Sequence, residues 1–322
     1  MKRSTKVWLI VAGALVVAGL AVIIVALAMN NWNLGRLSSV KYQTNSYEIK
    51  ESFDKIEIIS DTADIVFLPG ADGECRVVCE EKEKELHTVN VEDGKLTIKL
   101  EDTRKWYNYI TFLSIGSPKI TVYLPSGEYG DLIIKESTGE VDIPKDYRFE
   151  SIDISVSTGD VKCMASASEL FKIKTSTGDI FVESVTAGEM ILTVSTGKIT
   201  ASAISCVGNF KISVSTGKTN LENVRCADFK SKGTTGDITM NDVVATNMMN
   251  IERSTGDVKL EGCDAGEIYI KTDTGDVTGS LISEKIFFVN TDTGKKSVPQ
   301  TMSGGKCEIT CDTGDIIIKI QE

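Results

Sequence analysis

The residues that could carry out acid–base or metal chemistry in this chain are few. There is one histidine, His87, among 322 residues. Histidine is the commonest general base and metal ligand near neutral pH, so a catalytic triad or a typical zinc site would have to include it. Cys79 precedes His87, but the spacing between them matches no nucleophile–base motif. We therefore predict no catalytic residue, no metal site and no cofactor.

Aromatic side chains gather in one segment, residues 102–117, where the strand pattern is interrupted. Trp106, Tyr107, Tyr109 and Phe112 fall there, in a chain that is only 7% aromatic. Aromatic residues are enriched at recognition surfaces, so these four are our candidate contacts for a glycan, a peptide or a lipid head group. The alternative is that they cover an open end of the fold or pack on its side.

Carboxylates recur at regular intervals after Thr-Gly pairs. Calcium accepts carboxylate oxygens, but the glycine-rich nonapeptide of calcium-binding β-rolls is absent. A carbohydrate-active enzyme would need carboxylates clustered in a groove, whereas the repeat already accounts for these. We interpret them as a solvated acidic face. They are Asp160, Asp179, Asp237, Asp257, Asp276 and Asp315.

The overall charge restricts the partners. The formal net charge is −11, which disfavours nucleic acid and peripheral docking on anionic lipid. Apolar residues make up 41% of the chain and charged residues 25%, with five prolines, which is typical of a folded chain. Charged partners, if any, should be basic or bridged by a cation.

A Thr-Gly pair recurs ten times, in steps of 19 or 20 residues. Glycine tolerates the positive φ that a sharp corner needs, so we predict a structural corner at each pair. The pairs are Thr138-Gly139, Thr158-Gly159, Thr177-Gly178, Thr196-Gly197, Thr216-Gly217, Thr235-Gly236, Thr255-Gly256, Thr274-Gly275, Thr293-Gly294 and Thr313-Gly314.

Apolar residues alternate on both sides of every corner and predict two short strands per repeat. One such column, seven residues before the glycine, includes Phe171, Phe210 and Phe229. A single repeat cannot bury its apolar face alone, but stacked repeats can. The prediction is an all-β protein, a β-solenoid of about ten coils and roughly 45 Å in length at about 4.8 Å per coil. By strand parity we expect the corner threonines to point inward.

The chain has eight cysteines and no Cys-x-x-Cys pair. Cys75 and Cys79 lie on one predicted strand, with Cα atoms about 13 Å apart, too far for a disulfide. Cys206 and Cys226 are one repeat apart, so a bridge between them stays open. Because free cysteine is often buried, we expect mostly buried thiols.

The N-terminus carries an uncharged run, residues 7–29, preceded by Lys2, Arg3 and Lys6. As a helix the run would be roughly 34 Å long, enough to cross a hydrocarbon core of about 30 Å. The positive-inside rule places the N-terminus in the cytoplasm and the rest outside. A cleaved signal sequence, with Ala26-Leu27-Ala28 at the cleavage site, is the alternative.

We therefore divide the chain into five parts. Residues 1–6 are a cytoplasmic tail, 7–29 a transmembrane anchor and 30–50 a juxtamembrane linker. Residues 51–125 are an N-terminal β region that caps the solenoid, and 126–322 are the repetitive solenoid. Terminal repeats are usually atypical because they cover an open core. The segment Ser60-Asp61-Thr62-Ala63-Asp64 looks like a degenerate corner with alanine in place of glycine.

These motifs resemble a known family. The strand at residues 53–58 (FDKIEI), the strand at 120–125 that ends in Leu-Pro, and the serial Ser-Thr-Gly-Asp corners are similar to the putative-adhesin β-strand-repeat family of bacterial cell-envelope proteins. The resemblance covers residues 50–322. It implies a β-solenoid, with roles in adhesion for some relatives and in envelope-stress responses for others. It implies no catalytic residues.

Our leading hypothesis is a non-enzymatic, single-pass surface scaffold or adhesin-like module, with an envelope protein or a glycan as partner. The alternative is a stress-response component that senses antimicrobial agents or cell-wall damage, which induction by cell-wall antibiotics would favour. We also expect the last strand, residues 316–320 (IIIKI), to form the open end of the solenoid. An unpaired strand edge invites self-association.

Overall fold

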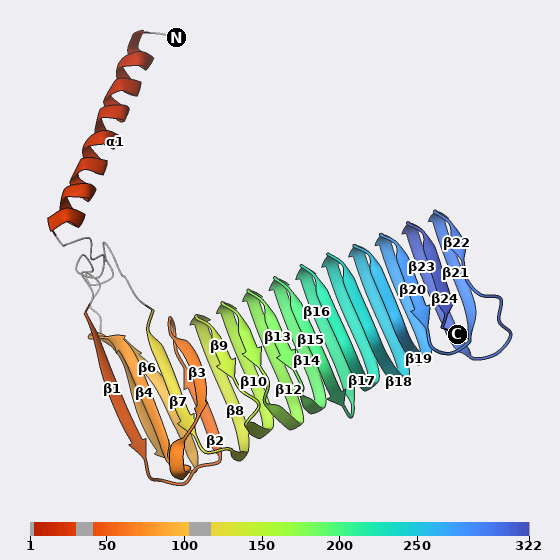
Figure 1. The fold of residues 1–322 in the computed structure, drawn as a ribbon, viewed down its shortest axis with the longest axis horizontal. Coiled ribbons are helices and arrows are strands. Elements are labelled where there is room, and N and C mark those ends of the chain that lie inside the picture. Colours follow the sequence, from red (N-terminus) through yellow and green to blue (C-terminus); the bar gives the residue numbers. More distant parts are fainter. Residues whose placement is uncertain (1–2, 30–40, 103–116, 322) are drawn as a thin grey trace.

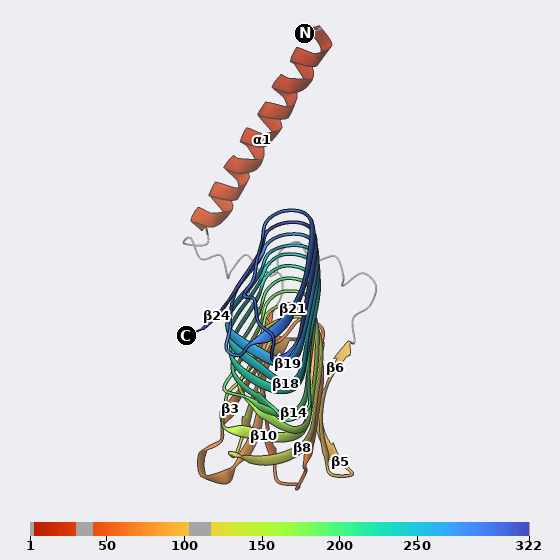
Figure 2. The same cartoon turned by 90° about the vertical axis from the view of Figure 1, so that its right-hand side faces the viewer.

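The computed structural model describes residues 3–29, 41–102 and 117–321. The N-terminal helix α1 (Arg3–Met29) precedes 24 strands that form one continuous, hydrogen-bonded sheet. Within α1, the 25 residues Thr5–Met29 are long and apolar enough to cross a membrane, and none of the apolar window is buried against the protein. The strands wind into a rod, which Figure 1 shows from the side and Figure 2 from its end.

The repetitive body of the rod starts at β8 (Gly127–Thr138). Each coil has one strand before its corner and one after it, although in the middle of the rod adjoining strands run together. The remaining strands are β9 (Val141–Ile143), β10 (Tyr147–Thr158), β11 (Val161–Cys163), β12 (Ser166–Thr177), β13 (Ile180–Glu183), β14 (Thr186–Thr196), β15 (Ile199–Cys206), β16 (Asn209–Thr216), β17 (Thr219–Thr235), β18 (Ile238–Thr255), β19 (Val258–Thr274), β20 (Val277–Leu281), β21 (Lys285–Thr293), β22 (Lys296–Ser297), β23 (Gly305–Thr313) and β24 (Ile316–Ile320).

Two walls of parallel strands enclose the core. The pre-corner wall runs from β8 through β10, β12, β14 and β16 into the later halves of β17, β18 and β19. The post-corner wall runs from β9 through β11, β13 and β15 into the earlier halves of the same three long strands. Like positions therefore lie in register from coil to coil, and the predicted β-solenoid is confirmed.

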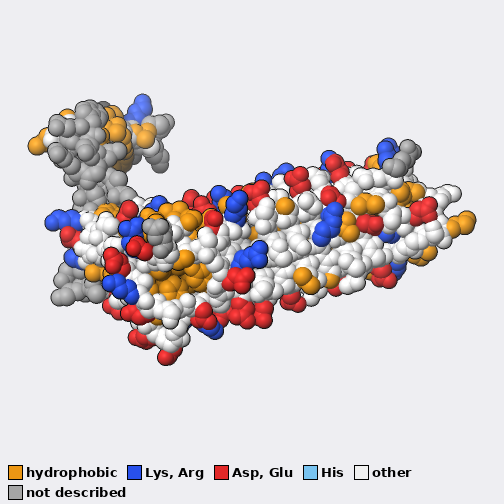
Figure 3. Space-filling view, turned by 60° about the horizontal axis from the view of Figure 1, so that its bottom comes forward, with side chains coloured by type: hydrophobic (Ala, Val, Ile, Leu, Met, Phe, Trp, Pro, Cys, Tyr) orange, Lys and Arg blue, Asp and Glu red, His pale blue; other side chains and the backbone are white. Residues whose placement is uncertain are grey.

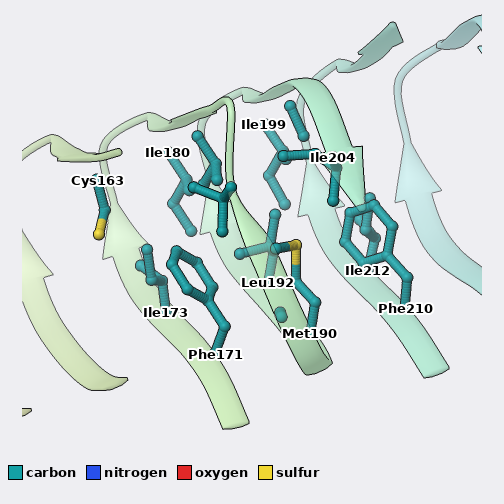
Figure 4. Packing of buried hydrophobic residues seen from close by; sticks show 14 of the residues in the cluster. Cys163, Phe171, Ile173, Ile180, Met190, Leu192, Ile199, Ile204, Phe210 and Ile212 are labelled. Atoms are coloured by element: carbon teal, nitrogen blue, oxygen red, sulfur yellow. The ribbon is translucent and has the colours of Figure 1, made fainter. Parts of the chain in front are cut away.

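The apolar columns point between the two walls (Figure 4). Phe171, Phe210 and Phe229, the residues that had to be interior for the prediction to hold, are all fully buried. They belong to one contiguous hydrophobic cluster that extends from Ile56 in the N-terminal region to Ile318 near the C-terminus. Residues 51–125 therefore share their core with the repeats.

At the ten corners, glycine is required for two physical reasons. The glycine φ angles lie between +121° and +157°, where side chains are disfavoured. A Cβ atom at any of these glycines would also lie 1.8–2.3 Å from the carbonyl oxygen of the corner stacked next to it. Ala63 occupies the equivalent corner before Gly139 and contributes that oxygen. The corners thus stack more closely than any side chain would permit.

The corner threonines do not point inward, contrary to our expectation. All ten are exposed, and the interior position is the residue three before each glycine, such as Thr175. The parity argument fails because the chain turns between these positions and the strand pairing skips one residue there. The interior Thr175 hydroxyl donates instead to the corner carbonyl of Gly159, over 3.2 Å.

The N-terminal region adds strands to both walls. β2 pairs with β8 and β6 in parallel, and β5 pairs with β6 in antiparallel. β3 pairs with β9 and β7 in parallel, and β4 pairs in antiparallel with β7 and β1. The bounds are β1 (Tyr42–Ile49), β2 (Lys55–Ile59), β3 (Asp64–Pro69), β4 (Cys75–Lys82), β5 (Glu85–Glu92), β6 (Lys95–Asp102) and β7 (Lys119–Leu124), with a 3-10 turn at Ala71–Gly73.

One segment of this region differs from our division of the chain. We expected residues 30–50 to be a linker, but Tyr42–Ile49 forms β1, paired with β4 along its whole length. The residues on one face of β1, such as Tyr47 and Ile49, pack against the core. Polar residues on its other face concealed this alternation when the segment was judged by composition. Residues 30–40 lie outside the described part of the chain.

The C-terminal coils are stacked out of sequence order. β23 lies between β19 and β21 in the pre-corner wall, and β24 lies between β20 and β22 in the post-corner wall. The last coil of the sequence is therefore inserted beneath the one before it. Our expectation that Ile316–Ile320 forms the open end is wrong, because β20 pairs with all five residues and β22 covers Ile316 and Ile317. The outermost strands are β21 and β22.

Candidate functional site

The aromatic segment of residues 102–117 cannot be placed in the fold. Trp106, Tyr107, Tyr109 and Phe112 lie outside the described residues. Their connection is nevertheless defined: β6 ends at Asp102 and β7 begins at Lys119, and these strands flank β2 and β3 in opposite walls.

The corner aspartates form a ladder of hydrogen bonds along the rod. The Oδ1 atom of Asp160 accepts the backbone N–H of Asp179 over 2.7 Å, and Asp179 accepts that of Lys198 at the same distance. Further bonds start at Asp64, Asp237, Asp257, Asp276 and Asp315, each to the residue after the next stacked corner. Each carboxylate therefore has a backbone donor, which accounts for the row without a bridging cation.

A buried polar network crosses the N-terminal region, and the sequence did not lead us to expect it. His87 Nε2 lies 2.9 Å from the Ser60 hydroxyl, and His87 Nδ1 lies 2.7 Å from Glu81 Oε2. The order Ser–His–carboxylate is that of a catalytic relay. However, the exposed fractions are 9% for Ser60, 3% for His87 and 1% for Glu81. In the described part of the chain, the Ser60 hydroxyl and its two partners are therefore largely covered by other side chains.

A second buried carboxylate, Glu136, lies beside this network on β8. It is 4% exposed, and its Oε1 atom accepts the N–H of Thr138 over 3.3 Å. Its Oε2 atom is buried without a hydrogen-bond partner among the described residues. Burial raises the pKa of Glu136 to about 7, against the lowering effect of its hydrogen bonds. This carboxyl group therefore holds its proton to a higher pH than an exposed one.

A buried arginine interrupts the apolar core in the middle of the rod. Arg253 is 4% exposed, and its Nη2 atom donates to Ser231 over 2.9 Å and to Thr219 over 3.4 Å. None of the described carboxylates forms an ion pair with it, and its Nε atom has no partner among the described residues. Desolvation lowers the pKa of Arg253 to about 10. Its guanidinium occupies the space that a side chain at Gly233 would fill.

The sequence contained a signal for this arginine that we did not use. Ser231 and Thr219 are the exceptions in their apolar columns, and Gly233 lacks the side chain that Val214 provides one coil earlier. Three polar or missing side chains in adjoining coils point to one buried polar group in the space between them.

A groove near the N-terminal end of the rod is lined in part by aromatic side chains. Its volume is about 440 Å³, and Tyr129, Phe149, Arg148, Glu128 and Ala167 contribute to its lining. The rings of Tyr129 and Phe149 lie 5.8 Å apart. On the face seen in Figure 3, hydrophobic side chains gather near this end of the rod, whereas the middle is mostly neutral and polar.

The sequence of the chain matches a known family. A family model described as Toastrack DUF4097 matches residues 53–213 and 205–322. The chain belongs to the Toastrack family. This confirms the resemblance found in the sequence. No curated protein matches this Toastrack chain in sequence.

Solved structures resemble this Toastrack chain in fold at low identity. A "putative adhesin" from Bacteroides fragilis NCTC 9343 is 16% identical, covers 87% of this chain and 97% of its own, and has a TM-score of 0.39. A "putative lipid binding protein" from Parabacteroides distasonis ATCC 8503 is 13% identical, covers 86% and 97%, and has a TM-score of 0.47.

The cysteines of this Toastrack chain are all free. Seven are buried, as expected, and Cys75 is half-buried. Cys206 and Cys226 lie on successive coils, each 5% exposed, and they are not bridged. Burial raises the pKa of the Cys163 thiol to about 12, so its reactive thiolate is scarce.

Proposed function

We propose that this chain is a non-enzymatic, membrane-anchored scaffold of the cell surface, adhesin-like in the broad sense. The observation that carries the proposal is the combination of a long apolar helix, whose apolar window is not buried against the described residues, with a rod of stacked coils. Lys2, Arg3 and Lys6 precede the uncharged run of residues 7–29, so the positive-inside rule orients the rod outward. A stiff rod holds a contact surface away from the membrane.

The topology is tested by thiol labelling of intact cells. Met302 is 100% exposed at the far end of the rod, so Met302→Cys offers an accessible thiol. The native cysteines give low background because they are mostly buried. A membrane-impermeant maleimide should label Met302→Cys and leave Ser4→Cys unlabelled until the cells are opened. Labelling of Ser4→Cys alone on intact cells would reject the orientation.

We propose two candidate contact regions. One is the groove rimmed by Arg148 near the N-terminal end of the rod, and the other is the aromatic segment that contains Trp106 and Tyr109, which lies outside the described residues. Aromatic rings with a few charges at the rim suit a glycan or a peptide. Full-length chain should capture a partner from envelopes, and the double variant Trp106→Ala/Tyr109→Ala should capture less. Tyr269→Ala, a half-buried aromatic far along the rod, is the matched control.

A further variant, Arg148→Ser, distinguishes the contribution of the groove to partner capture from that of the aromatic segment. Loss of capture in the Trp106→Ala/Tyr109→Ala variant alone assigns the partner to the aromatic segment, and loss in Arg148→Ser alone assigns it to the groove. Equal capture by wild type, both variants and Tyr269→Ala would reject both regions.

Self-association is the second interaction that we propose, and β21 is the strand that would support it. β21 has no described neighbour on its outer edge, and it exposes 40% of Ile286 and 56% of Phe288. Unpaired edges with apolar side chains favour strand addition. Light scattering of the full chain in detergent should find a dimer that Phe288→Lys converts to a monomer. A wild-type monomer would remove the proposal.

A further inference from the structure

Three side chains with metal-binding atoms meet inside the N-terminal region. Cys79 and Glu81 are two residues apart on β4, so both face inward, and His87 faces them from β5. Their ligand atoms all lie within 4.8 Å of one another, and among the described residues no other group of this kind occurs. β4 belongs to the post-corner side and β5 to the pre-corner side of the rod. The cluster therefore lies between the two walls.

The atoms around the cluster hold its donors in defined orientations. Asn45 Nδ2 donates to Glu81 Oε1 over 2.6 Å, and the backbone N–H of His87 donates to Glu81 Oε2 over 2.6 Å. The hydroxyl of Ser60 engages His87 Nε2, and that of Tyr47 donates to the His87 carbonyl oxygen over 3.0 Å. Metal-binding histidines characteristically use their second ring nitrogen in such a contact. Here it leaves Nδ1 facing Glu81.

We propose that Cys79, Glu81 and His87 bind one divalent transition-metal ion of the zinc type. Sulfur, imidazole nitrogen and carboxylate oxygen are the donors that zinc takes in proteins. The ion would lie between Nδ1 and Oε2, which are in direct contact at 2.7 Å in its absence. On binding, the Cys79 thiol loses its proton to solvent, and so does any proton held between Nδ1 and Oε2. His87 then binds the ion through Nδ1 and carries its single ring proton on Nε2, where it is donated to Ser60.

The charges of the bound site explain why so deep a location is suitable. One thiolate and one carboxylate carry two negative charges, and the divalent ion carries two positive charges, so the site is neutral overall. A neutral complex avoids the desolvation penalty that an unbalanced buried ion would incur. The other buried cysteines lie in apolar columns and lack a histidine. The donor set thus exists at one place in the described fold.

The proposed role of the ion is to join the two walls. β4 and β5 follow each other in the chain, but they do not pair, and each lies beyond the last full coil. The core at this end is closed by β1 and the β5–β6 hairpin. A bound ion would cross-link the walls where repeat stacking ends, because metal binding adds directly to folding free energy. This departs from our sequence-based expectation of no metal site.

The first test is the metal content of the full chain in detergent, purified reduced and without a polyhistidine tag. After loading with zinc and dialysis, mass spectrometry should find one ion per chain. Loading with Co²⁺ should give a thiolate-to-cobalt charge-transfer band. A wild-type chain that retains no ion overturns the proposal.

Variants assign the ion to these residues. Cys79→Ser should lose the charge-transfer band, whereas Cys163→Ser, a fully buried cysteine in an apolar column, should keep it. Ser60→Ala removes the hydroxyl at Nε2 and should weaken binding by about 10–100-fold. Retention of the band in Cys79→Ser would overturn the site.

Comparison of the metal-free proteins distinguishes a folding defect of the Cys79→Ser variant from loss of the metal ion. Cys79→Ser and metal-free wild type should melt at similar temperatures, and zinc should raise the melting temperature of wild type alone. If zinc leaves the melting temperature of wild type unchanged, the proposed cross-link between the walls is wrong.

Discussion

The guanidinium of Arg253 makes a quantitative prediction about Gly233. A Cβ at Gly233 would lie 2.2 Å from Nη1 and 2.7 Å from Cζ of Arg253. In the wild-type background Gly233→Val must therefore expel the guanidinium from its contacts with Ser231 and Thr219. Overpacking costs about 1–3 kcal/mol, and each lost hydrogen bond to a charged group adds about 1.5–3 kcal/mol. We expect Gly233→Val to destabilise the protein by about 4 kcal/mol, the low end of this sum, because the bond to Thr219 is long at 3.4 Å.

In the Arg253→Val background the sign should reverse. The clashing atoms are gone, and a valine at position 233 fills the space that they leave. Burial of the valine side chain contributes about 1.5 kcal/mol, and loss of glycine flexibility in the unfolded chain about 0.5–1 kcal/mol. Gly233→Val should then stabilise by about 2 kcal/mol. The coupling between the two positions is the difference, about 6 kcal/mol.

The assay is urea unfolding of the four chains of this double-mutant cycle. The hydroxyls of Ser231 and Thr219 have lost the Arg253 donor in both chains that carry Arg253→Val. The effect of Gly233→Val measured between these two chains therefore does not include that loss. Gly127→Val is the control, since the nearest atom to its Cβ is 4.0 Å away and its effect should be the same in both backgrounds. If Gly233→Val has the same sign with and without Arg253, the guanidinium does not occupy the space beside Gly233.

Three further predictions concern the corners and Glu136. Gly217→Ala, whose Cβ would lie 1.8 Å from a stacked carbonyl, should lower the melting temperature strongly, whereas Gly127→Ala should not. Asp179→Ala removes a 2.7 Å bond to the next coil and should cost about 1–2 kcal/mol in urea unfolding; a cost no larger than that of Asp292→Ala would refute the ladder. Between about pH 4.5 and 7 the folded chain keeps the Glu136 proton that the unfolded chain has released, so wild-type stability should fall as pH rises. Glu136→Gln should remove that slope in pH-dependent melting, and an unchanged slope would contradict the pKa argument.

The repeat could be predicted because an apolar residue recurs at the same position of nearly every repeat, so each interior column is supported many times over. Ten copies of one corner, each flanked by alternating apolar residues, define the coil and its register. A single strand such as Tyr42–Ile49 offers no such repetition. Its inward residues include polar ones, so its alternation is weak, and composition suggested a linker. Its pairing with β4 supplies the backbone hydrogen bonds that composition does not reveal.

The candidate metal cluster could not be predicted by the same reasoning. Its donors come from β4 and β5, which contact each other across the core and not through a shared ladder. The available signal was parity: Glu81 and His87 fall on inward positions of their strands. A charged residue on an apolar face requires a partner in the interior. That rule predicts a polar network, but it does not identify the residues that complete it.

The order of the last coils has a physical cause that lies in one residue. Every coil presents the same parallel edge, so stacking alone does not decide which coil is outermost. Pro299 follows β22 and has no N–H to donate, so a strand through it suits an edge and not the interior of a wall. β24 (Ile316–Ile320) contains no proline and buries Ile316 and Ile318. Placing the coil of Pro299 at the end leaves β24 with a neighbour on each side, which is the arrangement observed. The coil that contains Pro299 therefore lies outermost, although it precedes the last coil in sequence, because its proline makes it the poorest template for a further strand.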